Sequence, residues 1–146
     1  MWRGFLRMAR ALAAAVEHQL GESGLSSADF EVLVALSEAD RGTMRVRDLG
    51  VSIGWDRSRI AHQLRRMEQR GLVSRFECAT DGRGTMVRLT DDGHAAIVAA
   101  VPGHVETVRS LFVDQLEADD IARLAAIATR VVGAARSAGI VCAEGK

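Results

Sequence analysis

Residues 56–76 read DRSRIAHQLRRMEQRGLVSRF, and the pattern within this stretch decides the fold. Ile60, Leu64 and Met67 recur at spacings of four and three, which predicts a helix with one buried stripe. Arg59 and Arg66 flank the opposite face, and the planar donors of arginine fit both phosphate oxygens and the O6/N7 edge of guanine. That opposite face carries Ser58, His62, Arg65 and Gln69. We therefore expect a helix that packs on a core with one side and meets DNA with the other.

The residues after this helix predict a β-hairpin. Gly71 is expected to end the helix, and residues 72–78 and 85–89 then read as two strands. The segment 79–84 between them holds two glycines and an aspartate, which favours a turn with a basic tip. Thr90 is expected to cap the next helix. A helix followed directly by a hairpin is the order of a winged helix-turn-helix.

Two shorter helices are predicted before residue 56. The first runs from residue 26 to about residue 38, with Ser26 as its N-cap and Asp29 in the capping-box position. The second covers residues 46–53 and is closed by Gly54. Trp55 in the following turn is expected to plug the space between the helices, with base contact as the alternative. Asp56 is expected to cap the arginine-rich helix.

The two ends of the chain predict long amphipathic helices. We expect one domain over residues 1–146, with a DNA-binding lobe at 26–90 and dimerisation helices at 2–20 and 91–138. Pro102 and Gly103 should bend or break the second region locally. These helices carry more apolar surface than a small lobe can cover, which favours a homodimer over a monomer. The predicted fold class is mainly α with a small β-hairpin wing, a winged helix-turn-helix plus a helical dimerisation region.

Charge is distributed unevenly along the chain although its formal net charge is +0. Residues 41–90 hold 11 arginines against 5 acidic residues, whereas the remainder holds 8 basic against 14 acidic residues. A basic centre between acidic ends gives a local footprint for a polyanion.

The sequence gives little support for a metal protein, an enzyme or a membrane protein. Cys78 and Cys142 lie far apart without metal-ligand spacing, and the histidines show none either, so we expect no metal site, no cofactor and a reducing cytoplasm. The sequence carries no familiar catalytic motif, so we expect no catalytic residue and no enzyme. No stretch is expected to approach a membrane span, so we expect no membrane partner. The rival interpretation is an effectorless dimeric DNA-binding or architectural module.

Two stretches, SRIAHQLRRMEQRGLVSR and DGRGTMVRLTDDG, resemble the MarR family of bacterial transcription regulators. The second matches the family's wing pattern at Asp81, Arg83, Leu89, Thr90 and Gly93. The resemblance implies an obligate dimer that regulates transcription, often as a repressor released by a small phenolic or aromatic ligand or by oxidation. It also implies that Arg83 enters the minor groove and that Asp81 orients it. The chain departs from the family at Gly50, where alanine is usual, and at Pro102.

We expect residues 56–70 to enter the major groove of a pseudo-palindromic operator and the hairpin to enter the minor groove. The expected partners are double-stranded DNA, a second copy of the chain and a small-molecule effector bound between the dimerisation helices and the lobe. The protein would be cytoplasmic, on the bacterial nucleoid when bound to DNA. An oxidation sensor based on Cys78 stays open as an alternative. The candidate DNA-binding residues are Arg57, Ser58, Arg59, His62, Gln63, Arg65, Arg66, Arg75, Asp81 and Arg83.

Overall fold

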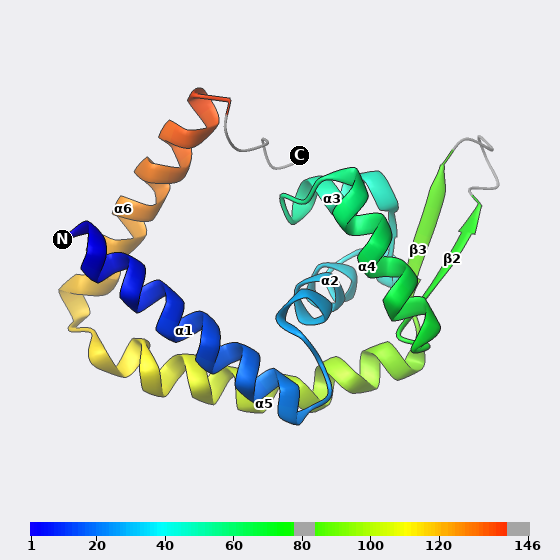
Figure 1. The fold of residues 1–146 in the computed structure, drawn as a ribbon, viewed down its shortest axis with the longest axis horizontal. Coiled ribbons are helices and arrows are strands. Elements are labelled where there is room, and N and C mark those ends of the chain that lie inside the picture. The colour runs from blue at the N-terminus through cyan, green and yellow to red at the C-terminus, as the bar shows by residue number, and fades with distance from the viewer. Residues whose placement is uncertain (78–83, 140–146) are drawn as a thin grey trace.

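The protein, described by a computed structural model over residues 1–77 and 84–139, is mainly helical with one small sheet. Figure 1 shows α1, α5 and α6 as a long frame and the other elements as a lobe at one end of that frame. The predicted fold class is confirmed. The elements are α1 (Trp2–Glu22), α2 (Ser27–Ser37), η1 (Asp40–Gly42), β1 (Thr43–Arg45), α3 (Val46–Ser52), α4 (Arg57–Gln69), β2 (Val73–Glu77), β3 (Thr85–Leu89), α5 (Asp91–Leu111), η2 (Val113–Gln115) and α6 (Ala118–Ser137).

The sheet contains one strand that sequence analysis missed. Its order is β1-β3-β2, both pairings are antiparallel, and Val87 of β3 lies opposite Met44 on one side and Arg75 on the other. The missed strand, β1, has only three residues, which is too few to show an alternating pattern. Arg41 (φ 52°) and Gly42 (φ 64°) are both left-handed and turn the chain into it. The strand therefore ties the start of α3 to the hairpin.

The core of the lobe lies between α2, α4 and the sheet and continues to α1 and α5. The predicted stripe of Ile60, Leu64 and Met67 is at most 1% exposed. The other buried apolar residues are Leu20, Leu25, Val32, Leu33, Leu36, Leu49, Trp55, Leu72, Val73, Val87, Ile97 and Ala100. Only one side of α4 packs on this core, so its opposite side stays exposed.

Three predicted helix caps are confirmed. Ser26 and Asp29 form the capping box of α2, and each side chain accepts a hydrogen bond from the other residue's backbone N–H. The Asp56 carboxylate accepts from the N–H groups at the start of α4. Thr90 Oγ1 accepts from the Gly93 N–H at 3.0 Å. Each cap satisfies donors that a helix N-terminus leaves without an intrahelical partner.

Of the bend or break expected at Pro102, the break does not occur, because α5 continues through this residue as one helix from Asp91 to Leu111. Figure 1 shows it as a curved rod rather than two pieces. Proline removes one intrahelical hydrogen bond, to the residue four positions earlier. Pro102 and Val98 are both exposed, so the missing bond falls on the solvent side of the helix, where water can replace it.

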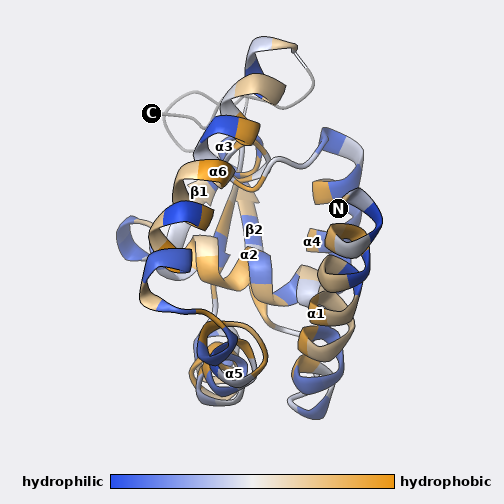
Figure 2. Ribbon diagram, turned by 90° about the vertical axis from the view of Figure 1, so that its left-hand side faces the viewer, coloured by the Kyte–Doolittle hydropathy of each residue, from blue (hydrophilic) through white to orange (hydrophobic). Residues whose placement is uncertain are grey.

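The long helices expose much apolar surface. Figure 2 shows hydrophobic residues interleaved with hydrophilic ones along α1, α5 and α6. Among the described residues, α1 buries only Leu20 and α6 buries none. The exposed large apolar residues of these helices and of η2 are Trp2, Phe5, Met8, Val98, Val101, Val105, Leu111, Val113, Ile121, Ile127, Val131 and Val132.

One segment contradicts the expectation that no stretch approaches a membrane span. Asp91–Gln115, which comprises α5 and η2, is long and apolar enough to cross a membrane, with a mean hydropathy of 1.3 over its most apolar window. Length and composition alone support this assignment, and helices that bury an apolar face in a soluble protein meet the same two criteria. The apolar character of this segment also indicates that α5 needs a second apolar surface.

Candidate nucleic-acid interface

The arginine-rich helix α4 begins at an N-terminus that the Asp56 side chain caps. The Asp56 Oδ1 atom accepts hydrogen bonds from the N–H groups of Ser58 at 2.8 Å and Arg59 at 2.9 Å. The buried stripe fixes the rotation of the helix about its axis. Six of the predicted contact residues on α4 are therefore held on its exposed side. They are Arg57, Ser58, Arg59, His62, Arg65 and Arg66.

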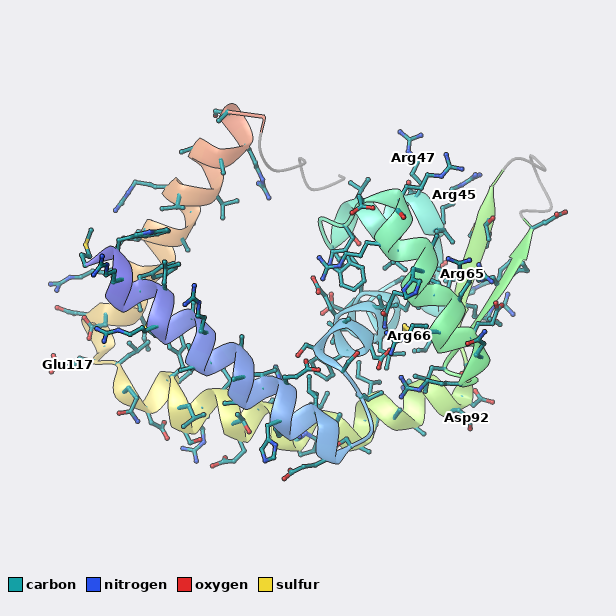
Figure 3. The ribbon with its side chains drawn as sticks, viewed as in Figure 1. Arg45, Arg47, Arg65, Arg66, Asp92 and Glu117 are labelled. Atoms are coloured by element: carbon teal, nitrogen blue, oxygen red, sulfur yellow. The ribbon has the colours of Figure 1, made fainter. Side chains whose placement is uncertain are left out.

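Two further arginines extend this basic face. Figure 3 shows Arg45 and Arg47 projecting from the start of α3, next to the sheet, and Arg65 and Arg66 lying along α4. Arg47 is exposed and Arg45 is half-buried. These two arginines were not among the predicted DNA contacts, although Arg41, Arg45 and Arg47 form a cluster of basic residues that could have indicated them. The face is thus built from α3 and α4 together.

Gln63 does not belong to the exposed face, and its assignment as a DNA contact is corrected. Its side chain is 7% exposed, and its Nε2 donates to Asp29 Oδ1 at 2.7 Å. Position 63 follows Ile60 by three and precedes Met67 by four, so it lies on the buried stripe. A polar residue is tolerated there because Asp29 satisfies its amide.

Asp29 also holds the end of α4. Arg70 donates from Nη1 to Asp29 Oδ2 at 2.7 Å and from Nη2 to the Gly24 carbonyl at 2.5 Å. Burial works to raise the pKa of Asp29, but hydrogen bonds from Ser26 and Arg70 outweigh it, so the pKa lies below its ordinary value. Asp29 lies 41 positions before Arg70 in the chain, so no local pattern in the sequence indicates this ion pair. Arg70 is therefore a structural residue.

Arg75 is held in a similar way by Glu68 of α4. Its backbone N–H donates to Glu68 Oε1 at 3.1 Å, and its Nε donates to Oε2 at 2.9 Å. Hydrogen bonds from the Arg75 side chain lower the pKa of Glu68. Two of the three guanidinium nitrogens are engaged, since Nη2 also bonds Glu68 at 2.5 Å. Arg75 thus fixes β2 against α4, and its predicted contact with DNA stays a prediction.

Trp55 fills the turn between α3 and α4, as predicted, and is 9% exposed. Its backbone N–H donates to the Gly50 carbonyl at 2.8 Å. A Cβ atom on Gly50 would lie 3.2 Å from the Trp55 carbonyl oxygen, so glycine lets α3 approach this turn closely. The Arg59 guanidinium lies over the indole, 3.9 Å from its centroid. Trp55 therefore fills the turn and also supports the side chain of Arg59 on the exposed face.

Two predicted contacts, Asp81 and Arg83, lie outside the described residues, as do both cysteines. Their predicted roles stay predictions.

A separate hollow of about 800 Å³ lies between the frame and the lobe. It is open on one side and mainly apolar, with Val16, Phe30, Val34 and Ile53 among the residues that line it. His104 of α5 also lines it, with its ring 4.6 Å from that of Phe30. Val132 and Arg136 of α6 complete the far side. Its place corresponds to the one expected for an effector.

Comparison with known proteins identifies this architecture. The MarR family model matches residues 25–85, which include the helix-turn-helix and extend through β2 to the first residue of β3. The crystal structure of AbsC, a MarR family transcriptional regulator from Streptomyces coelicolor, aligns with a TM-score of 0.89 and 35% identity over 93% of this chain and 92% of that chain. The chain belongs to the MarR family.

A second solved MarR family regulator, Sco3205 from Streptomyces coelicolor, was crystallised in complex with DNA. It is 32% identical, with a TM-score of 0.86 over 90% of this chain and 82% of that chain. The uncharacterized HTH-type transcriptional regulator YdgJ of Bacillus subtilis is 35% identical over 75 residues. That match spans 51% of this chain and 44% of the length of YdgJ. This MarR protein is therefore similar to regulators of transcription, one of which binds DNA in its crystal structure.

Proposed function

We propose that this MarR protein represses transcription by binding a pseudo-palindromic operator as a homodimer. The helix α4 enters the major groove, and the hairpin reaches the minor groove. The observation that carries this proposal is the exposed basic face of α3 and α4. The buried residues of α4 fix the rotation of that helix about its axis, so its arginines point to solvent. The MarR resemblance supports the repressor role and a place in the bacterial cytoplasm, on the nucleoid when bound to DNA.

The homodimer rests on the apolar faces of α1, α5 and α6. A second copy supplies an equally apolar surface, and a two-fold axis buries the same patch on both subunits. Two copies also present two α4 helices, which fit half-sites separated by about one turn of DNA.

A salt titration tests the basic face. Arg65→Ala/Arg66→Ala should weaken binding to all DNA sequences about equally, because flexible exposed arginines contact phosphates. The slope of log K against log salt should become shallower by roughly 0.9 for each phosphate that a subunit no longer neutralises. Arg123→Ala/Arg130→Ala on α6 removes the same charge away from this face and is the matched control. An equal change of slope in both variants would place DNA elsewhere.

A small aromatic or phenolic ligand is the proposed effector, and the hollow beside Phe30 and His104 is its proposed site. The hollow touches both the frame and the lobe, so a ligand there changes the distance between the two lobes of a dimer if it binds one arrangement better. Aromatic walls favour a flat ring, since stacked and tilted ring pairs are attractive.

A panel of phenolic and aromatic acids tests this site through release of fluorescent operator DNA. We expect at least one compound to release the wild-type protein from operator DNA. Val34→Phe narrows the hollow, so this variant should bind that compound at least about tenfold more weakly. Ala99→Val adds about the same volume on the exposed side of α5 that carries Asp92 and Glu106, away from its apolar stripe, and should respond as wild type. Equal responses of the two variants would exclude this hollow, and no response to any compound favours the effectorless module.

A further inference from the structure

The arginines of residues 57–75 fall into three groups according to what their guanidinium groups contact. Arg70 and Arg75 are bound to acids, so their charge is already partnered. Arg57, Arg65 and Arg66 of α4 are exposed and form no hydrogen bond or ion pair with another side chain of the described residues. Arg59 differs from both groups, because its guanidinium lies 3.9 Å from the centroid of the Trp55 indole. No described acid pairs with it.

Stacking restrains an arginine without using its hydrogen bonds. The donors of a guanidinium lie in its plane, so a face placed on an indole leaves the outer edge available. That edge is the part that can donate to O6 and N7 of guanine. A side chain already held in one orientation also loses less conformational entropy on binding. Arg59 therefore has the geometry of a base-reading residue, whereas freely rotating arginines suit phosphates.

Trp55, which lies beneath the Arg59 guanidinium, is itself fixed in position. The Trp55 N–H is bonded to the Gly50 carbonyl, and Gly50 has no Cβ atom to push the turn away. The Asp56 carboxylate holds the backbone N–H of Arg59 at 2.9 Å. Arg59 also lines an open hollow of about 440 Å³ together with Trp55 and His62.

We propose that Trp55 is a specificity-determining residue that positions Arg59 to read a guanine in each operator half-site. Trp55 acts through Arg59 and does not touch the base. This inference rests on the proposed function, because it requires an operator that the protein selects.

A double-mutant cycle on DNA binding tests this role. Trp55→Leu should lower discrimination at one G·C position roughly tenfold, with binding to nonspecific DNA and the salt slope unchanged. Arg59→Ala should lose the same discrimination, and the double variant should lose no more than Arg59→Ala alone. Trp55→Phe keeps an aromatic face and should retain most of the discrimination. Arg59→Lys keeps the charge but not the plane, so it should bind DNA without this preference.

Thermal unfolding and sedimentation of each variant separate positioning from loss of fold. If Trp55→Leu does not fold, Trp55→Phe and Arg59→Lys still complete the comparison. Additive losses in the cycle, or an Arg59→Lys protein that retains the preference, would overturn the inference. If the wild-type protein selects no operator at all, the proposed function fails instead, so the two failures are distinguishable.

Discussion

Ile121→Glu/Val131→Glu should convert the dimer into a folded monomer that binds its operator at least about 100-fold more weakly than the wild type. Both side chains are exposed in the single chain, at 51% and 63%, and lie on the apolar side of α6. A carboxylate buried without a partner in an apolar interface is strongly unfavourable, so the subunits should separate. Each lobe then holds only one half-site, and the gain from binding two linked sites disappears.

Sedimentation and operator titration at the same protein concentration measure the two effects. Ala126→Glu is the control, because it places the same charge on the exposed opposite side of α6. It should stay dimeric and bind normally. A double variant that remains dimeric, or a monomer that binds as tightly as wild type, would contradict the assigned interface.

Asp29→Ala should destabilise the protein by about 2–4 kcal/mol, because it leaves Gln63 unsatisfied in the core and Arg70 without its acid. The Arg70 side chain is 41% exposed and can regain water, which keeps the cost below that of a fully buried pair. In thermal unfolding at equal protein concentration, the midpoint should fall by about 5–12 °C. Glu31→Ala, an exposed acid on the same helix, should shift it by no more than about 2 °C.

The Asp29 effect should depend on pH. The folded protein lowers the pKa of this carboxyl. Its charged form therefore contributes stability that is fully present above the unfolded pKa of about 3.9. That contribution disappears as pH falls through the lowered folded pKa. The difference between wild type and Asp29→Ala should therefore be full at neutral pH and shrink in strong acid. A difference that does not change with pH would mean that packing, not charge, explains the loss.

Local patterns were enough to predict most of the lobe. The caps at Ser26, Asp56 and Thr90 depend on residues only two or three positions apart, and the stripe of α4 repeats within one helix. The exposed arginines followed from the same periodicity. These features are visible in one sequence because each depends on neighbours along the chain.

Interactions between distant residues could not be predicted in this way. Asp29 is 34 positions from Gln63 and 41 from Arg70, so nothing local indicates that it removes both from the DNA-binding face. The strand β1 is defined by its pairing with β3 rather than by its own three residues. The stacking of Arg59 on Trp55 likewise depends on the turn that Gly50 permits.

Selection of bound fragments from genomic DNA, followed by footprinting, tests the central claim most directly. We expect enrichment of one inverted repeat whose half-site centres lie about 10 base pairs apart, with protection of both halves. We also expect that the preference at one G·C position in each half disappears with Arg59→Ala. Enrichment of no common sequence, or of a single half-site without symmetry, would contradict the account.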